Sequence, residues 1–296
     1  MTAVPRGLAW WRERPGGAAW LERLPRLVAE CAERWELAVG APFQPASIAY
    51  VAPVTRADGT PAVLKVNFPE PESEHEAGAL AHWAGAGAVR LLADDSERRA
   101  LLVERCEPGA QLWSVADEEE ANRAAAAVLR RLWRPVPREH PFRTLDAEAR
   151  RWAIELPPRW DRHRPPQDRT LLDRAIGWID ELLASPDEAV VLHQDLHGGN
   201  VLSAAREPFL AIDPKPLVGE RSFDVASLVR DRRDELAVDP WPARRIRRRL
   251  DQLTAELELD RERTRRWAVV HALAWGLEAD DWEPEMIACA AWLAAA

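Results

Sequence analysis

Apolar positions in the first hundred residues form one helical pattern followed by several short runs. Residues 18–37 carry apolar side chains at helical spacing and predict a helix, although Pro25 interrupts it. The short runs predict strands, because turn residues bound each of them. These runs cover residues 47–54, 61–66, 88–92 and 100–104. Asp58-Gly59, between the first two runs, predicts a hairpin.

From residue 111 onward the apolar spacing is mainly helical. The predicted helices cover residues 117–132, 145–156, 170–183, 223–235, 242–257 and 261–277, with one more near the C-terminus. Two proline pairs, Pro157-Pro158 and Pro165-Pro166, are expected to bracket an irregular stretch. The basic run at residues 244–249 is interpreted as an arginine-covered solvent face of its helix.

These two patterns predict an α+β fold with two lobes. We place the small lobe at residues 1–103, with a helix at residues 72–84 that Pro71 opens. A hinge is expected at residues 104–110, where Pro108-Gly109 interrupts the pattern. The larger, mainly helical lobe then covers residues 111–296.

One segment of the larger lobe, residues 190–213, concentrates the candidate chemistry. Its apolar residues predict a buried strand at 190–192, a loop at 193–200 and a hairpin built from 201–202 and 209–212. This order directs Asp195, Asn200 and Asp213 toward one place.

Phosphoryl transfer needs a group that orients the attacking hydroxyl and takes its proton, and oxygen ligands for Mg²⁺. Asp195 suits the first role, and Asn200 and Asp213 suit the second. The alternative is a polar loop with a coincidental D-x₄-N spacing. The ordered arrival of strand, loop, hairpin and Asp213 disfavours it.

The same residues carry a resemblance to a known family. The spacing D-x₄-N followed by an Asp after a strand resembles the protein kinases. The form H-Q-D-L-H-G-G-N-V-L at residues 193–202 is similar to the aminoglycoside phosphotransferases. I-D-P-K-P at residues 212–216 and G-E-R-S-F-D-V-A at residues 219–226 resemble the branch that phosphorylates streptomycin and hydroxyurea.

This resemblance implies a bilobal, protein-kinase-like fold with a small five-stranded antiparallel sheet in the first lobe and an ATP cleft between the lobes. It implies ATP and Mg²⁺ as cofactors, and transfer of the γ-phosphoryl group to a hydroxyl of an aminoglycoside such as streptomycin. Hydroxyurea or another small metabolite is the alternative acceptor. A non-catalytic nucleotide-binding regulator is a further alternative, which the intact set of candidate side chains disfavours.

The resemblance also assigns residues in the small lobe. Lys65, near the end of the second predicted strand, would hold the α- and β-phosphates, and Glu76 on the following helix would hold Lys65. Glu72 and Glu74 are the alternatives to Glu76. Either could also be present simply because acidic residues suit a helix N-terminus. No glycine occurs in residues 42–51, so a glycine-rich phosphate loop is absent.

Further roles follow from the resemblance. A phosphate contact from Ser47 stays open, and adenine would bond the hinge backbone at Glu104 and Cys106. His193 and Asp224 would support the catalytic loop structurally, although an N-cap role is open for Asp224.

Lysine is nearly absent, since Lys65 and Lys215 are the only two among 40 lysines and arginines. This bias is typical of a GC-rich genome, so we interpret both as positions that need a compact ammonium. Lys215 could contact a phosphate or pair with a carboxylate, and the sequence does not choose. The role of His197, which could face substrate, also stays open.

Charge and composition narrow the partners. The net charge of −9 disfavours nucleic acid and is compatible with a cationic small-molecule substrate. Glu278, Asp281 and Trp282 lie in the densest acidic stretch of the last helical region and are candidate substrate contacts. The alternative for them is a solvated helix end.

Other compositional features concern the compartment. No apolar run is long enough for a membrane span, and no secretory segment is expected. Cys31, Cys106 and Cys289 are far apart in the sequence and fit a reducing, cytoplasmic setting. Nothing in the sequence indicates the oligomeric state.

Overall fold

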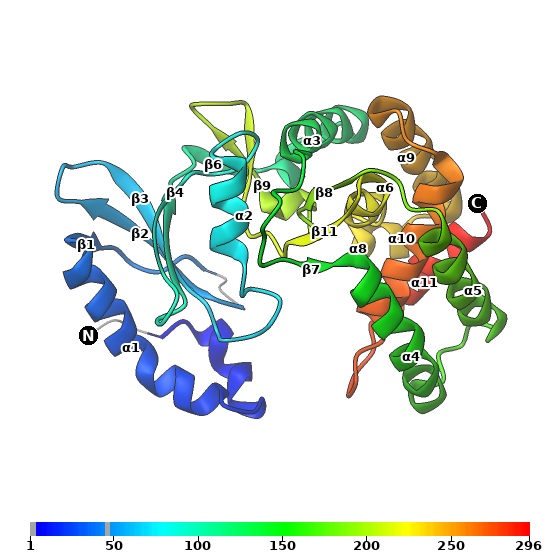
Figure 1. The fold of residues 1–296 in the computed structure, drawn as a ribbon, viewed down its shortest axis with the longest axis horizontal. Helices are drawn as coiled ribbons and strands as arrows, with labels where there is room; N and C mark the ends of the chain where they lie inside the picture. The colour runs from blue at the N-terminus through cyan, green and yellow to red at the C-terminus, as the bar shows by residue number, and fades with distance from the viewer. Residues whose placement is uncertain (1–3, 45–47) are drawn as a thin grey trace. The chain divides into compact units, whose positions relative to one another are not determined.

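The computed structural model describes residues 4–44 and 48–296. The chain divides into two compact units, Met1–Gly109 and Ala110–Ala296 (Figure 1). The first contains an antiparallel sheet with helices, and the second is mainly helical. The predicted two-lobed α+β fold is confirmed.

The first lobe is built on a five-stranded antiparallel sheet of order β1-β2-β3-β5-β4. Its elements are a 3-10 helix (Arg6–Glu13), α1 (Gly17–Arg34), β1 (Leu37–Val39), β2 (Tyr50–Arg56), β3 (Pro61–Val66), α2 (Glu76–Trp83), β4 (Leu91–Asp95) and β5 (Ala100–Glu104). Helix α1 packs its apolar face on this sheet and forms the lobe's core with buried residues of β2 and β3. Gly59 takes a left-handed φ of 82° in the predicted hairpin.

Several boundaries in the first lobe differ from the sequence prediction. Helix α1 ends at Arg34, because Glu36 turns the backbone with a φ of 52°, and Leu37 then begins a strand. Helix α2 begins at Glu76, after turns that follow Pro71. The predicted strand at 88–92 starts only at Leu91, and predicted strand residue Ser47 lies outside the described residues.

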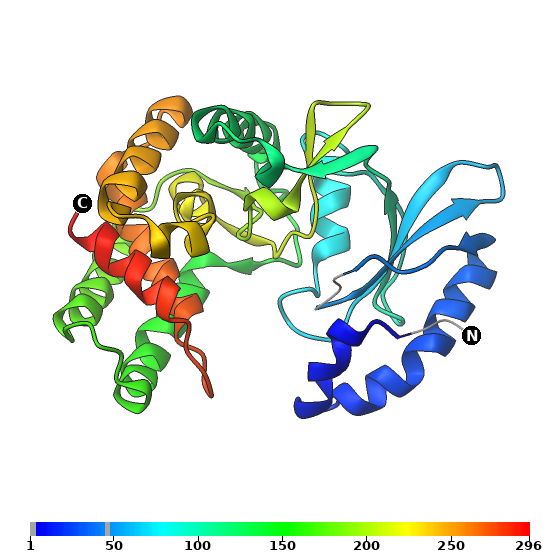
Figure 2. The same cartoon turned by 180° about the vertical axis from the view of Figure 1, so that it is seen from behind.

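The second lobe combines helices with two small three-stranded sheets, β10-β9-β6 and β7-β11-β8. Its strands are β6 (Pro108–Gln111, which begins at the last residues of the first unit), β7 (Arg143–Thr144), β8 (Ala189–Leu192), β9 (Val201–Ala204), β10 (Phe209–Ala211) and β11 (Leu217–Glu220). Its longer helices are α3 (Glu118–Leu132), α4 (Leu145–His163), α5 (Thr170–Ala184), α9 (Pro242–Leu257), α10 (Arg261–Gly276) and α11 (Pro284–Ala294). Helices α3 and α9 run side by side in both views (Figure 1 and Figure 2).

The buried core of this lobe centres on α10, which contacts α11, α5, α9 and α7. Among the described helices, none combines the length and apolar character that crossing a membrane requires.

Two predictions for the second lobe are wrong. Helix α4 continues through Pro157 and Pro158 to His163, because Leu156 and Trp160, on either side of the prolines, stay buried on the same face of the helix. It ends where Arg164 turns left-handed with a φ of 48°.

The single helix predicted at residues 223–235 is three short helices, α6 (Arg221–Asp224), α7 (Ala226–Val229) and α8 (Arg233–Val238). Arg232, with a φ of 53°, separates the last two. Because apolar side chains on both sides of this break are buried, periodicity alone could not reveal it.

A buried ion pair joins the sheet around β11 to helix α10. Glu220, the last residue of β11, is 4% exposed. Its carboxylate accepts hydrogen bonds from Arg263, from the Trp267 indole and from the backbone N–H of Asp187. Removing the arginine would leave a buried carboxylate without its cation.

We therefore expect Arg263→Met to lower the unfolding free energy by about 3–5 kcal/mol, the loss typical of breaking a buried pair from one side. Arg266→Met is the matched control, because its partners Glu181 and Glu262 are substantially exposed and such pairs contribute about 0–1 kcal/mol. Urea denaturation of both variants measures the difference. Equal losses in the two variants would contradict the role assigned to Glu220.

Candidate active site

Asp224 fixes the start of the loop that carries Asp195. Its carboxylate accepts the backbone N–H groups of His193 at 3.2 Å and Gln194 at 2.7 Å, and the Trp133 indole N–H at 3.0 Å. Asp224 is fully buried and is the last residue of α6, so it is not an N-cap. Burial raises the pKa of this carboxyl to about 6, while the three donors oppose the rise.

His193 joins this loop to the segment that carries Asp213. Its Nε2 donates to the Ile212 carbonyl at 2.9 Å, and its own carbonyl accepts from the Lys215 N–H at 3.0 Å. The imidazole is fully buried, and burial lowers its pKa to about 4. A neutral, enclosed ring braces the backbone and is a poor candidate for proton transfer.

Asn200 and Asp213 follow from the same backbone arrangement. The side-chain Nδ2 of Asn200 donates to the main-chain carbonyl of Asp195 at 3.0 Å, and the main-chain carbonyl of Asn200 accepts from the Ile212 N–H at 2.9 Å. Asp213 is the next residue, with a left-handed φ of 58°. The β9–β10 hairpin therefore brings Asp195, Asn200 and Asp213 into one compact segment.

The donor set fits magnesium. Since the Asn200 nitrogen is bonded to the loop, its amide presents an oxygen, and Asp213 adds a carboxylate. Mg²⁺ in proteins uses one or two such oxygens together with water and substrate phosphates. Within residues 4–44 and 48–296, no group of three or more His, Cys, Asp or Glu side chains is arranged to hold a metal. The amide–carboxylate pair does not require such a group.

Two side chains flank the Asp195 carboxylate. Lys215 Nζ lies 3.2 Å from Oδ2, and His197 Nε2 lies 4.0 Å from Oδ1. His197 Nδ1 accepts the Gly199 N–H at 3.1 Å, so a neutral ring carries its proton on Nε2, toward Asp195. The sequence left both residues open, and the structure places both beside the candidate base.

The loop glycines lie against a tryptophan platform. Gly198 N–H donates to Asp231 Oδ2 at 2.8 Å, and the Trp113 indole donates to Asp231 Oδ1 at 2.8 Å. Trp113 also stacks on His197 with ring centroids 5.2 Å apart. A Cβ at residue 198 would lie 2.5 Å from Trp113 Cδ1, so the close approach requires glycine.

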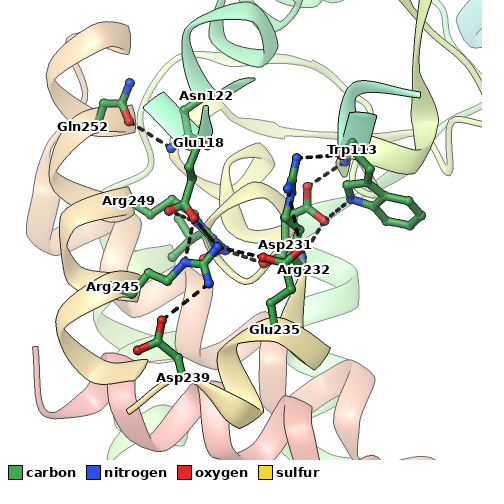
Figure 3. A network of polar contacts seen from close by, with 12 residues as sticks. Trp113, Glu118, Asn122, Asp231, Arg232, Glu235, Asp239, Arg245, Arg249 and Gln252 are labelled. Carbon is green, nitrogen blue, oxygen red and sulfur yellow. Dashed lines mark hydrogen bonds and ion pairs between the residues drawn. The ribbon is translucent and has the colours of Figure 1, made fainter. Parts of the chain in front are cut away.

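A polar network behind this platform connects α3, α8 and α9 (Figure 3). Glu118 at the start of α3 accepts from both Arg245 and Arg249, and Arg249 also donates to the carbonyls of Val229 and Asp231. Arg249 is 2% exposed. The interpretation of residues 244–249 as a solvent face is therefore wrong for Arg249, because its guanidinium turns inward to donate to the carbonyls at the α7–α8 break.

In the first lobe, Lys65 on β3 pairs with Glu76, the first residue of α2. Lys65 Nζ lies 2.8 Å from each carboxylate oxygen, and the pair is buried. Asn67 Nδ2 also donates to Glu76 at 2.8 Å, a partner that sequence reasoning missed. The alternative partner Glu74 instead lies 3.5 Å from Arg99.

The predicted hinge residues lie at and after the end of β5. The N–H of Glu104 donates to the Arg90 carbonyl at 2.9 Å, and its carboxylate accepts the Arg90 N–H at 3.0 Å. The Glu104 side chain thus serves the sheet. Cys106 is half-buried.

The acidic stretch at residues 278–283 forms a small hairpin closed by the Leu277–Trp282 bridge. It is docked on the end of α4, since the Glu278 carbonyl contacts His163 Nε2 at 2.9 Å. Glu278 and Asp281 are exposed. The hairpin follows α10, which carries Trp275, and Lys215 Nζ lies 4.6 Å from the Trp275 ring centroid.

Residues 34–284 match the family model described as aminoglycoside/hydroxyurea antibiotic resistance kinase. The chain belongs to this family. It is therefore a small-molecule kinase, and the sequence prediction of a phosphotransferase is confirmed.

Curated relatives include a streptomycin 6-kinase of Streptomyces griseus, 40% identical over 93% of this chain and 91% of the relative. A hydroxyurea phosphotransferase of Kitasatospora aureofaciens is 38% identical over 93% of this chain and 80% of the relative.

Solved structures share the fold of this kinase. An aminoglycoside phosphotransferase of Streptomyces rimosus, solved with ADP and streptomycin, has a TM-score of 0.57 at 20% identity and covers 87% of this chain and 99% of its own. A choline kinase of Streptococcus pneumoniae has a TM-score of 0.62 at 13% identity and covers 93% of this chain and 100% of its own. At these identities the likeness concerns the protein-kinase-like fold alone.

His271 on α10 is a buried histidine of this kinase that the sequence did not single out. It is fully buried against Phe223 and Trp275, and neither ring nitrogen has a hydrogen-bond partner among the described residues. Burial lowers its pKa well below the usual range, and the charges of Arg230 and Lys215 lower it further. The ring is therefore neutral in the folded state and protonates on unfolding below about pH 6.5.

This difference makes unfolding take up a proton in acid, so stability is lost as the pH falls below the unfolded pKa. Between about pH 6 and 5, we expect the unfolding free energy of the wild type to fall faster than that of His271→Leu. The difference in slope should be about 1.4 kcal/mol per pH unit. Urea titrations at several pH values measure both slopes, and parallel slopes would show that His271 does not titrate in this way.

Proposed function

We propose that this kinase transfers the γ-phosphoryl group of ATP, with Mg²⁺, to a hydroxyl of streptomycin. The observation that carries the proposal is the convergence of Asp195, Asn200 and Asp213 on one braced segment. The buried Lys65–Glu76 pair of the first lobe is the second element of the same apparatus.

Asp195 orients the acceptor hydroxyl and takes its proton as the bond to phosphorus forms. Its carboxylate is held by its loop, whose backbone is bonded to Asp224 and Asn200. Positioning of this kind supplies much of the acceleration in phosphoryl transfer, since the protein does little covalent chemistry.

Asn200 and Asp213 would hold Mg²⁺ through an amide and a carboxylate oxygen. When bound, the metal neutralises charge on the nucleotide phosphates. The hydrogen bond from the Asn200 nitrogen to the Asp195 carbonyl fixes the metal ligand relative to the base.

Lys65 binds the α- and β-phosphates, and Glu76 orients its ammonium. Asn67 donates to the same carboxylate and restricts it further. The main chain at Glu104 and Cys106 receives adenine, a contact that does not depend on either side chain.

Streptomycin is favoured as acceptor by the two streptomycin 6-kinases, 40% and 38% identical to this chain. Its guanidinium groups are cationic, and the net charge of −9 attracts cations. Glu278, Asp281 and Trp282 of the exposed hairpin supply carboxylates and an aromatic face for such groups. Hydroxyurea is the second candidate, because a hydroxyurea phosphotransferase is 38% identical.

An acceptor assay tests the proposal. Purified protein with ATP and Mg²⁺ should consume ATP when streptomycin is added, and ³¹P NMR should show a new phosphomonoester on its 6-hydroxyl. Chelation of Mg²⁺ should stop the reaction. Turnover with hydroxyurea but not streptomycin would support the second candidate. ATP binding without turnover of either compound would contradict the proposed reaction.

Replacing the base separates its role from binding. We expect Asp195→Asn to lower kcat by on the order of 10²–10⁴-fold, because the amide cannot take the hydroxyl proton. Asp146→Asn, at an exposed pair with Arg150, is the matched control and should keep wild-type turnover. Steady-state kinetics with streptomycin measure both, and an active Asp195→Asn enzyme would remove Asp195 from the mechanism.

The lysine partner is tested through nucleotide binding. Glu76→Gln replaces the ion pair with a hydrogen bond from the Lys65 ammonium to a neutral amide, so Lys65 is held less firmly and the KM for ATP should rise by about tenfold. Glu74→Gln, which removes the rejected partner, should leave that KM unchanged. If the two variants behave alike, Glu76 is not the residue that positions Lys65.

A further inference from the structure

Two cations lie around one tryptophan next to the candidate base. Lys215 Nζ is 3.2 Å from Asp195 Oδ2 and 4.6 Å from the centroid of the Trp275 ring. The guanidinium carbon of Arg230 is 5.5 Å from the same ring. These three residues come from the segment after Asp213, from the end of α7 and from α10.

Arg230 is an unusual member of this cluster because it is buried and incompletely bonded. It is 4% exposed, its Nε contacts Met286 Sδ at 3.1 Å, and its Nη1 has no partner among the described residues. Burial lowers the pKa of its guanidinium to about 10, and the Asp195 carboxylate is the largest influence that opposes this. A buried cation of this kind is costly unless an anion shares its site.

Two positive charges, on Lys215 and Arg230, lie near the Asp195 carboxylate. Cations on this side of the base favour an anionic group there over the guanidinium groups of a cationic acceptor. The anion that the proposed reaction brings to Asp195 is the phosphoryl group. Its charge spreads over three equatorial oxygens during transfer, and fixed cations stabilise it most at that stage.

We propose that Lys215 and Arg230, held by Trp275, form an anion subsite beside Asp195 that binds the phosphoryl group during its transfer. This inference rests on the proposed function. The acceptor oxygen forms its bond to the γ-phosphorus while the bond to the β–γ bridging oxygen breaks, and ADP leaves with that electron pair. The acceptor proton goes to Asp195, and Lys215 and Arg230 keep theirs.

The subsite explains the second surviving lysine. Lys215 must contact a carboxylate, an aromatic face and a phosphoryl oxygen, and a compact ammonium on a flexible stem can do so. A planar guanidinium has a fixed fork of donors and is not equivalent there. The sequence left open whether Lys215 contacts a phosphate or a carboxylate. In this proposal Lys215 contacts the Asp195 carboxylate first and the phosphoryl group during its transfer.

Lys215→Met tests the subsite, because methionine keeps the apolar stem against Trp275 and removes the charge. We expect kcat to fall by on the order of 10²–10³-fold, the effect of removing one donor to a transition-state oxygen. The affinity for ADP·Mg²⁺ should stay within about twofold, since the subsite acts on the transferred group. Lys215→Arg should recover part of kcat.

A transition-state mimic gives a readout that a merely structural role would not change. Calorimetry with ADP·Mg²⁺, streptomycin and aluminium fluoride should show tighter ADP binding than without fluoride in the wild type. This tightening should be lost in Lys215→Met and reduced in Arg230→Lys. Arg174→Met is the matched control, since the exposed Arg174 of helix α5 lies 4.9 Å from the centroid of the Trp178 ring and the variant should behave as wild type.

The outcomes distinguish this inference from the proposed function. A wild type that phosphorylates its acceptor, with Lys215→Met keeping both kcat and the fluoride-dependent tightening, overturns the subsite alone. A wild type that neither binds ADP·Mg²⁺ nor phosphorylates streptomycin or hydroxyurea overturns both. Loss of kcat and tightening in Lys215→Met, with ADP affinity retained, supports the subsite.

Discussion

The segment of this kinase that carries the proposed catalytic residues depends on one buried carboxylate. Asp224 accepts the N–H groups of two consecutive residues, His193 and Gln194, just where β8 ends and the catalytic loop begins. Gln194 has a left-handed φ of 68°, a conformation that needs external support in a residue other than glycine. The Asp224 carboxylate provides this support, and Ser227 adds a hydrogen bond to the Gln194 carbonyl.

From this fixed point the remaining groups follow through the backbone. His193 bonds the loop to the segment at residues 212–215, and the Asn200 side chain donates to the Asp195 carbonyl within the loop. The network around Glu118 and Arg249 supports the loop through Asp231 (Figure 3). Polar groups outside the proposed mechanism thus determine where the proposed catalytic groups lie.

Each of the two lysines is paired with a carboxylate, in different lobes and at different depths. Lys65 is enclosed with Glu76, and both carboxylate oxygens bond its ammonium. Lys215 touches one oxygen of Asp195 and is more exposed, with 22% of its side chain accessible. The first arrangement suits a fixed contact to a bound nucleotide, and the second suits a contact that changes as charge moves.

The sequence predicted the two-lobed fold, because local spacing encodes its strands and helices. The order of strand, loop and hairpin predicted that Asp195, Asn200 and Asp213 lie on one segment, and the family resemblance indicated the pairing of Lys65 with Glu76 that the structure contains. Long-range partners were not accessible. Nothing near Trp113, Asp231 or Arg249 in the sequence indicates that they meet under the loop, since they come from a short 3-10 helix, from the break between α7 and α8, and from α9.

The wrong predictions share a physical cause. Prolines 157 and 158 were expected to end a helix, but burial of Leu156 and Trp160 outweighs their local effect. The break between α7 and α8 has no proline or glycine signal, and the buried side chain of Arg249 donates to its carbonyls. Tertiary packing therefore overrode local propensity at these places.

The central claim is that Lys65, Asp195, Asn200 and Asp213 act on one nucleotide–metal complex. A crystal structure with ADP, Mg²⁺ and streptomycin tests it most directly. The account predicts oxygen atoms of Asn200 and Asp213 on the metal, Lys65 Nζ on the α- or β-phosphate, and an acceptor hydroxyl in hydrogen-bond contact with Asp195. A metal held by other residues, or Lys65 away from the phosphates, would contradict it.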